Sequence, residues 1–438
     1  MRRREPASES AMKFLVPITL SALLCMQARA QAEPAASRDV GLPELLSHAE
    51  QHAPRLELAR RQRARADAAR VDASAWLHDD PTLTVAAGPR FAGAHSSALD
   101  LQASLAQPIE IAGEPGLRRT VAARVAERAL AELAGARAMV GLEVRLAYQA
   151  ARVARARLEL AARLDGFAER TLQVARRRLA AGDATRIDVL VAESGAARAR
   201  AALLEAKRSL ADARTELAEC TGWPLLEPPL VASGLESPEP PPSLAESLTR
   251  ARSTHPELRA VHAATEEARA RLALTDRQAL GTPTIGLSFS REGSVGSPAN
   301  TILLGSLALP LPLWAGNREA RARDRAEADI ARQEETLATQ RLEAAVIHAH
   351  TALASAAARS ALLEGAASAA LDTSLTLLEK GFEHGELSAL EVAAAEERLA
   401  DAQSDALDAR ADYHRARVEL EYLGGDLGSS GPDHGAER

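Results

Sequence analysis

Aromatic residues are scarce in this 438-residue chain, at 3% of the sequence, although 46% of its residues are hydrophobic. Globular cores usually take much of their bulk from Phe, Tyr and Trp, so this shortage argues against a thick core. The abundant residues are instead Ala, Leu, Arg and Glu, which is the composition of long helices and coiled coils. The sequence therefore predicts a mainly helical protein.

Cysteine, excess positive charge and long apolar runs are also missing. Only Cys25 and Cys220 are present, and removal of Cys25 with a signal peptide would leave one thiol and no internal disulfide. The net charge is −7, and arginines alternate with acidic residues, so nothing attracts nucleic acid. No apolar run approaches the length of a transmembrane helix.

The N-terminus has the pattern of a secretory signal over residues 1–30. Positive charges precede the short apolar run "FLVPITLSALL", and "ARA" offers small residues for cleavage after Ala30. Met12 is an alternative start, since "MKFLVPITL" alone makes a compact signal. Leu24 stands where a lipidation motif requires a small residue before Cys25, which favours ordinary cleavage. Export to the periplasm, the outer membrane or beyond follows.

The mature chain repeats itself. "SLAQPIEIAGEPGLRR" begins at Ser104, and "SLALPLPLWAGNREAR" begins 202 residues later at Ser306. The offset holds along most of the chain, and two copies predict a tandem duplication rather than a solenoid. We expect a first repeat at 31–223, a proline-rich connector at 224–242, a second repeat at 243–425 and a disordered tail at 426–438.

Each repeat shows the same order of elements. A helix is expected first, at about 42–77 and 243–280. Two strands with alternating apolar and polar residues follow, at 82–88 and 99–107 in one copy and at 284–291 and 301–311 in the other. Helical runs of about 65 residues then cover 116–180 and 317–381, which is roughly 100 Å each. A heptad seam for lateral packing consists of Leu146, Val153, Leu160, Phe167 and Val174.

Four strands cannot close a membrane barrel, which needs at least eight. An open sheet with a lipid-facing side is not tolerated in a bilayer, because its edges would leave backbone groups unpaired. If these strands enter a membrane, several chains must therefore pool them. Two, three or four chains would supply eight, twelve or sixteen strands.

The repeat, the paired strands before very long helices, and the turns "AGDATRIDVL" and "HGELSALEV" together resemble the TolC-like outer membrane efflux proteins. The wording of "QPIEIAGEPGLR" and "LPLPLWAGNREAR" is most similar to the cobalt–zinc–cadmium resistance (CzcC-type) branch, although Glu114 stands where that branch usually has Lys. The resemblance implies a homotrimer in the Gram-negative outer membrane, in contact with its lipid. Twelve strands would form one β-barrel, and the helices would form a periplasmic α-barrel. It also implies a periplasmic adaptor protein and an inner-membrane resistance–nodulation–division pump as partners.

The two turns carry the main functional hypothesis. Gly182 and Gly385 are expected in left-handed, helix-ending conformations. Thr185 with Asp188, and Ser388 with Glu391, have the spacing of capping boxes. The resemblance places adaptor docking at Gly182, Thr185, Gly385 and Ser388, and it places gate carboxylates at Asp188 and Glu391. In a trimer up to six carboxylates would then converge.

Three further residues are expected at junctions between strand and helix. Pro108 and Pro310 stand where each second strand gives way to a helical run, and proline suits a first helical turn. Trp314 follows the fourth strand, where an interfacial tryptophan would anchor at lipid headgroups. Packing at a bend between strand and helix is the alternative for Trp314.

Neither a metal site nor an enzyme is expected. His348 and His350 are two residues apart, so they point to different faces of a helix and cannot chelate one ion. No phosphate loop, nucleophile elbow or cofactor motif is present in the sequence. The expected function is export of divalent Co, Zn or Cd ions. A drug or protein exporter is the alternative within the family, and a structural coiled-coil protein is the alternative outside it.

Overall fold

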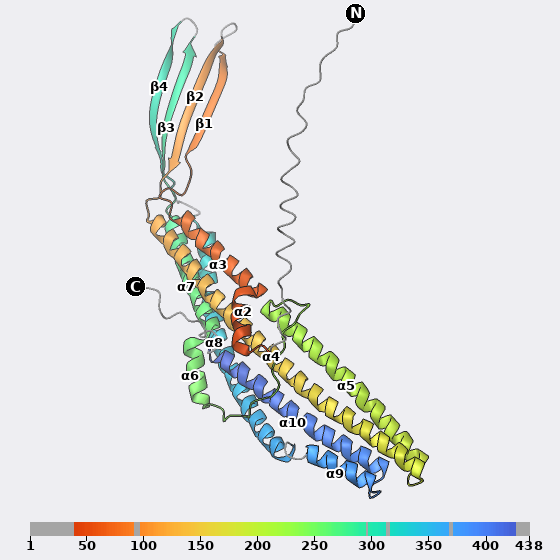
Figure 1. Ribbon diagram of the computed structural model, residues 1–438. Helices are drawn as coiled ribbons and strands as arrows, with labels where there is room; N and C mark the ends of the chain where they lie inside the picture. Colours follow the sequence, from red (N-terminus) through yellow and green to blue (C-terminus); the bar gives the residue numbers. More distant parts are fainter. Residues whose placement is uncertain (1–38, 92–96, 295–296, 312–315, 368–370, 426–438) are drawn as a thin grey trace, which may run out of the picture.

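The computed structural model describes residues 39–91, 97–294, 297–311, 316–367 and 371–425, and it is elongated (Figure 1). A four-stranded sheet forms one end and the turns of two long helical hairpins form the other. The predicted cleavage site at Ala30, Cys25, Trp314 and the tail at 426–438 lie outside the described residues. The fold-class prediction, mainly α with a small β part and duplicated helical hairpins, is confirmed.

In both repeats, short helices come first, two strands follow, and long helices come last, which is the order that the sequence predicted. The helices are α2 (Leu42–His52), α3 (Pro54–Ala73), α4 (Glu114–Ala181) and α5 (Arg186–Thr221) in the first repeat, and α6 (Leu244–Thr254), α7 (Pro256–Gln278), α8 (Arg318–Ala367), α9 (Leu371–Glu383) and α10 (Ala389–Leu423) in the second. The strands are β1 (Thr82–Phe91), β2 (Ser97–Pro108), β3 (Thr284–Ser294) and β4 (Ser297–Ala308).

The first helix of each repeat is two helices, so the prediction of one continuous helix at 42–77 and at 243–280 is wrong. Pro54 and Pro256 begin the second helix in each case. Proline has no N–H to continue the preceding helix, and it forces the residue before it out of the helical conformation. Ala53 and His255 accordingly have φ −61° and ψ 124°.

The longest helix, α4, has 68 residues and would reach roughly 100 Å. Of its predicted seam, Val153, Phe167 and Val174 are buried, while Leu146 and Leu160 are half-buried. Alanines at intervening positions are also buried, which lets α4 pack closely along α5, α7 and α10. In the second repeat the corresponding run is described as α8 and α9, because residues 368–370 lie between the described parts.

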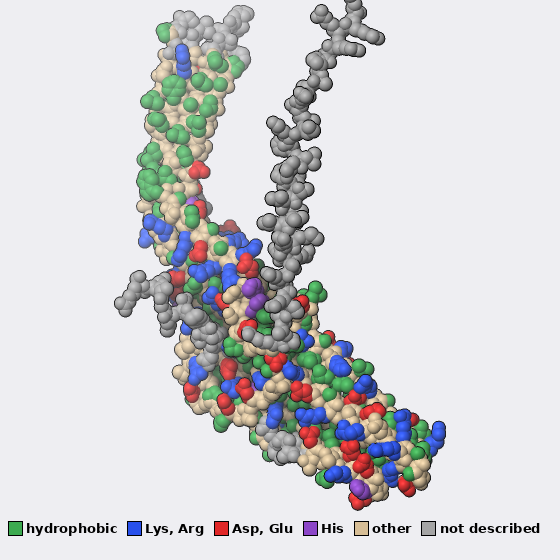
Figure 2. Space-filling model, viewed as in Figure 1, with side chains coloured by type: hydrophobic (Ala, Val, Ile, Leu, Met, Phe, Trp, Pro, Cys, Tyr) green, Lys and Arg blue, Asp and Glu red, His purple; other side chains and the backbone are tan. Residues whose placement is uncertain are grey.

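The four strands form one antiparallel sheet in the order β1-β2-β3-β4. The strands extend further than the sequence predicted, to Phe91 in β1, which pairs with Ser97, and back to Ser297 in β4, which pairs with Ser294. Side chains of one face are mostly apolar and exposed, among them Leu83, Leu105, Leu287 and Leu303. Figure 2 shows the concentration of hydrophobic side chains on the sheet and of charged ones on the helices.

The opposite face of the sheet carries mostly Thr, Ser, Gln and Gly, with one charged cluster. Arg90 of β1 lies 2.8 Å from Asp100 of β2 and 3.0 Å from Glu292 of β3. The ion pairs therefore tie three strands together on the polar face. Only β4 departs from the alternation, because Ile302 and Leu304 pair with Ser290 and Ser288 and so share the polar face.

The joint between β2 and α4 is built from the repeated motif. Gln107 donates to the carbonyl of Asp79 at 2.8 Å, and the guanidinium of Arg118 donates to Glu110. Glu114, which is 2% exposed, accepts the N–H of Ala112 at 2.8 Å. The acid at this position thus closes the turn into α4.

The junction prolines end strands but begin no helix. Pro108 is the last residue of β2, and α4 starts six residues later at Glu114. Pro310 follows β4 and stands against Gly281, where an added Cβ would lie 2.6 Å from its ring. At Pro108, residues 109–113 separate the strand from α4, and Pro115 takes the early helical position, so Pro108 lies outside the first turn of α4.

The connector between the repeats contains no helix or strand from 224 to 242 and runs against the helices. Arg214 donates to the carbonyls of Pro228 and Pro229, and the N–H of Val40 donates to the carbonyl of Leu230 at 2.8 Å. Val231 is 1% exposed and belongs to a core with α2, α4 and α5. None of the described helices combines the length and the apolar character that crossing a bilayer requires.

His255 generates a test of how pH affects this helical region. Its ring is 2% exposed, neither ring nitrogen has a hydrogen-bond partner among the described residues, and the ring stacks edge-on with Tyr422 at 5.5 Å. Burial lowers the pKa of His255 below its ordinary value. His255 therefore binds a proton at a higher pH in the unfolded chain than in the folded chain. The stability of the fold consequently falls as the pH drops below about 6.5.

We expect His255→Leu, purified in detergent, to lose less melting temperature between pH 7.5 and pH 5 than the unaltered chain does. The variant keeps an apolar side chain at the site and removes the titrating ring. His348→Leu, on the exposed side of α8, is the matched control. An equal loss of melting temperature in all three proteins would contradict the role assigned to the buried ring.

Candidate functional site

The candidate site is the end of the molecule opposite the sheet, where the two helical hairpins turn (Figure 1). In the first repeat α4 ends at Gly182, whose φ of 83° is left-handed and favours glycine. The N–H of Asp183 donates to the carbonyl of Arg178 at 2.9 Å, which satisfies one of the last acceptors of α4. Thr185 then caps α5.

The second repeat forms the same turn with different side chains. Gly385 has φ 79°, the N–H of Glu386 donates to the carbonyl of Gly381 at 2.9 Å, and Ser388 caps α10. The left-handed glycines and both capping boxes are therefore present where the sequence predicted them. The chemistry that starts a helix is the same at both turns.

Asp188 and Glu391 each fold back onto the cap of their own helix. One oxygen of Asp188 accepts both the N–H and the hydroxyl of Thr185, at 2.9 and 2.7 Å. One oxygen of Glu391 accepts the N–H and the hydroxyl of Ser388, both at 2.8 Å. These hydrogen bonds lower the pKa of both carboxyls. The hydroxyl of Thr185 has the largest effect on Asp188, and the N–H of Ser388 has the largest effect on Glu391. Both carboxylates stay charged at neutral pH.

Arg178 links the two turns across the repeat boundary. Its guanidinium donates to the carbonyl of Phe382 at 2.7 Å and to the carbonyl of Asp183 at 3.0 Å. It also lies 5.0 Å from the centre of the Phe382 ring, within the range of a cation–π contact. The Arg178 side chain, which belongs to the first repeat, therefore connects the turns of both repeats.

A shared apolar cluster lies behind these turns. Its buried members come from α4, α5, α9 and α10, and they include Phe167, Val189, Phe382 and Val392. On α10, burial raises the pKa of Glu396 to about 7, against the opposing effect of Arg198. The helix ends thus rest on a common core and carry a carboxyl that titrates near neutral pH.

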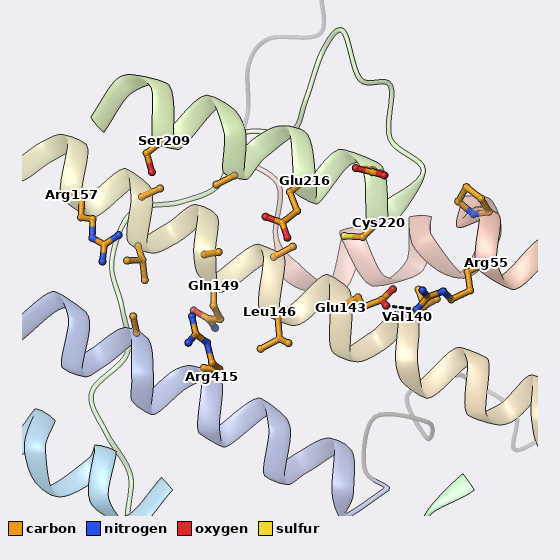
Figure 3. A pocket seen from close by; sticks show the side chains of 18 residues that line it. Arg55, Val140, Glu143, Leu146, Gln149, Arg157, Ser209, Glu216, Cys220 and Arg415 are labelled. Atoms are coloured by element: carbon orange, nitrogen blue, oxygen red, sulfur yellow. Dashed lines mark hydrogen bonds and ion pairs between the residues drawn. The ribbon is translucent and has the colours of Figure 1, made fainter. Parts of the chain in front are cut away.

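An open groove of about 820 Å³ lies elsewhere, where α3, α4, α5 and α10 meet (Figure 3). Glu143 is paired with Arg55 at one end, and burial, with the carboxylates of Glu143 and Glu216, raises the pKa of the Cys220 thiol to about 12. This thiol stays protonated at neutral pH and is a poor nucleophile. Within the described residues, no three His, Cys, Asp or Glu side chains converge as a metal site would require.

Sequence reasoning missed three features of this chain. Arg178 is one of three consecutive arginines, which the sequence alone does not distinguish. The one available signal is that the corresponding residue of the second repeat is Gly381 rather than a basic residue. The ion pair between Glu110 and Arg118 has a spacing of eight residues, which could have been read from the motif. The perturbed pKa of Glu396 had no sequence signal, since it depends on the packing of α10.

Two long helical hairpins beside one open four-stranded sheet characterise this chain. Residues 45–223 and 248–426 match the family model described as outer membrane efflux protein, one match for each repeat. The chain therefore belongs to the outer membrane efflux protein family, and its location is the outer membrane with an extension into the periplasm.

Two curated relatives are similar to this chain. Protein CyaE of Bordetella pertussis is 33% identical over 254 residues, which cover 55% of this chain and 53% of CyaE. The match thus spans about half the length of that relative. The cobalt-zinc-cadmium resistance protein CzcC of Cupriavidus metallidurans is 26% identical over 318 residues, which cover 72% of this chain and 75% of CzcC.

Solved structures share the fold. The CmeC outer membrane channel of Campylobacter jejuni superposes with a TM-score of 0.70 at 14% identity, covering 88% of this chain and 85% of CmeC. The open-state MtrE outer membrane channel of Neisseria gonorrhoeae gives 0.67 at 21% identity, covering 98% of each chain.

We expect Arg178→Ala to loosen both turns at once. The substitution removes two hydrogen bonds from a charged donor at a partly exposed site, and we expect a loss of about 1–2 kcal/mol in local stability. Hydrogen exchange at residues 182–185 and at residues 382–388 should accelerate together. The matched control is Arg177→Ala, which removes an exposed guanidinium 3.6 Å from Glu383. Faster exchange confined to residues 182–185 would contradict a link between the turns.

Proposed function

We propose that three copies of this chain form an outer-membrane channel of a tripartite efflux system. The observation that carries the proposal is the sheet, which has an exposed apolar face and, among the described residues, no strand beyond β1 or β4. A lipid-facing sheet must have its edges paired, and three copies of four strands give the twelve of one barrel. Family membership supports the same assembly.

The helical end would then extend into the periplasm, away from the barrel. In this assembly the turns at Gly182 and Gly385, with their caps Thr185 and Ser388, are the surface proposed for docking a periplasmic adaptor. An inner-membrane resistance–nodulation–division pump would supply the cargo and the energy. The exposed position of both turns at the end of the molecule supports this role.

Asp188 and Glu391 are proposed as the gate carboxylates at this end. Their lowered pKa values keep them charged, and three copies would bring up to six of them around one axis. A ring of negative potential would favour cations and slow anions where the passage is narrow. Asp188 and Glu391 also stabilise the helix caps through their hydrogen bonds to Thr185 and Ser388. A test of the gate must therefore separate the effect of charge from the effect of capping.

The charges can be removed while the caps are kept. In Asp188→Asn with Glu391→Gln, the amide oxygen of each side chain still accepts the N–H of Thr185 or Ser388. We expect this double variant to show higher single-channel conductance and a weaker cation preference in planar bilayers. Thr185→Ala with Ser388→Ala is the matched control, because it disturbs the caps and retains both charges. Unchanged conductance and selectivity would leave the carboxylates with the capping role alone.

The proposed cargo is a divalent cation of cobalt, zinc or cadmium. Two observations support this cargo. One is the similarity to CzcC over 72% of the chain, and the other is the amino-acid sequence of the two repeated motifs, "QPIEIAGEPGLR" and "LPLPLWAGNREAR". A passage formed by three chains need not recognise its cargo, since selection belongs to the pump. The passage would modestly favour cations, although its charges are screened within about 8 Å at physiological salt.

Deletion of the gene tests the cargo directly. We expect the deletion strain to become sensitive to at least one of the three metals and to accumulate it, because the outer-membrane exit is lost. Restoring the intact gene should restore resistance, while a copy that lacks residues 82–108 should not. Unchanged metal tolerance, combined with new sensitivity to dyes, detergents or antibiotics, would replace the metal cargo with a drug cargo.

A further inference from the structure

Two histidines of the short helix α2 lie on the same face of that helix. His48 and His52 are four residues apart, and their rings are stacked with centres 4.3 Å apart and planes 21° apart. His348 and His350, by contrast, are two residues apart and point to different faces of α8. A spacing of four on a helix is the one that lets two imidazoles hold a single metal ion.

Backbone carbonyls place the ring hydrogen on the same nitrogen in both histidines. The Nδ1 of His48 lies 3.1 Å from the carbonyl oxygen of Thr221 in α5, and the Nδ1 of His52 lies 3.1 Å from the carbonyl oxygen of His48. A carbonyl oxygen only accepts, so Nδ1 donates in both rings. A neutral imidazole held in this way has its free lone pair on Nε2. Histidine ligands in metal sites are oriented by the same kind of hydrogen bond.

The separation of the two rings suits a shared ion. A bond from Zn²⁺ to an imidazole nitrogen is about 2.0–2.1 Å long, so one ion joins two nitrogens that lie up to about 4 Å apart. The His48 ring is half-buried and also contacts Trp223, with ring centres 4.6 Å apart. The His52 ring is exposed and has room to turn. The pair thus combines one ring fixed by packing with one that adjusts to a ligand.

Two helices end beside this pair, and their ends favour a positive charge. α2 ends at His52 and α5 ends at Thr221 (Figure 1). The C-terminal end of a helix carries partial negative charge, which attracts cations within its last turn. Arg55, the first basic residue after His52, is already paired with Glu143. The electrostatic environment therefore favours a bound cation at the two rings.

The second repeat makes the corresponding joint between helices without a histidine pair. The residues at the places of the two histidines are Arg250 and Thr254. The hydroxyl of Thr254 donates to the carbonyl of Gly424, which corresponds to Thr221, at 2.6 Å. One hydroxyl therefore satisfies the helix end in that repeat. The joint as such does not require two imidazoles, so the pair in the first repeat is free to serve another role.

We propose that His48 and His52 bind one divalent transition-metal ion of the class of Zn²⁺ through their Nε2 atoms. Imidazole nitrogen suits Zn²⁺, Cu²⁺ and Ni²⁺, whereas Mg²⁺ prefers oxygen. Among the described residues no group of three His, Cys, Asp or Glu side chains converges, so water completes the coordination and the affinity is modest. The site lies within one chain, so the inference goes beyond the proposed function and depends on neither assembly nor cargo.

A bound ion would also stiffen the joint between α2 and α5. His48 already holds the carbonyl of Thr221, and the metal would connect its ring to the last residue of α2. Because the metal binds the folded chain, it would raise the melting temperature. The proposal therefore predicts both an affinity and a change in stability that depend on the same two side chains.

The affinity is tested by calorimetry with ZnCl₂ on the full chain, purified in detergent near neutral pH without a polyhistidine tag. His52→Ala removes one ligand and keeps the hydrogen bond from His48 to Thr221. We expect this variant to bind Zn²⁺ at least about tenfold more weakly at the tightest site, because even changes that only position a ligand cost 10–100-fold. The matched control is His348→Ala, which removes an exposed histidine of α8 and should bind Zn²⁺ like the unaltered chain.

The position of the ion is tested by histidine modification with diethyl pyrocarbonate, followed by mass spectrometry. Exposed His52 is the reporter, and Zn²⁺ should slow its modification while His348 reacts at an unchanged rate. In His48→Gln, which retains a polar side chain able to reach Thr221, Zn²⁺ should no longer protect His52. Mg²⁺ should protect His52 in neither protein, because it prefers oxygen ligands.

Three results would overturn the site. They are equal Zn²⁺ affinity in His52→Ala and the unaltered chain, equal protection of His52 with and without His48, and equal protection by Mg²⁺ and Zn²⁺. If His48→Gln does not fold, the calorimetry of His52→Ala decides alone. None of these results bears on the proposed channel, which is tested separately by its conductance and by deletion of the gene.

Discussion

Unpaired backbone groups at a sheet edge are the constraint on which the rest of this structure depends. Hydrocarbon offers no hydrogen bonds, so a sheet with a lipid-facing side must close on itself. Four strands are too few, and the exposed leucines of the apolar face make solvent an equally poor environment. The duplication supplies two hairpins with the same register, in which Thr82 pairs with Ala106 and Thr284 with Ala308, to one sheet.

At the helical end, single residues with special backbone preferences determine the shape. Pro54 and Pro256 divide the first helix of each repeat, and Gly182 and Gly385 reverse the chain at the turns. Within α4 and α8, Ala and Leu are abundant and the helices run for 68 and 50 residues. A long, thin molecule results, in which close packing of small side chains replaces the thick aromatic core that the composition cannot supply.

Features that depend on local chemistry could be predicted from the sequence, and features that depend on distant contacts could not. The strands, the left-handed glycines and the capping boxes follow from residues within a few positions of one another. The link from Arg178 to Phe382 joins residues 204 positions apart, and the burial of Glu396 depends on how α10 packs. The distance from Pro108 to the start of α4 at Glu114 could not be predicted either, since the length of a linker is weakly specified by its residues.

The arginine that joins the turns has no counterpart, because Gly381 occupies the equivalent place in the second repeat. An added Cβ at Gly381 would lie 3.0 Å from Leu387, so the site has little room for a larger residue. The two turns are therefore alike in backbone and unlike in surface. In a ring of these chains, a partner that binds every hairpin would meet two chemically different binding sites in alternation. Its copies would not all bind with equal affinity.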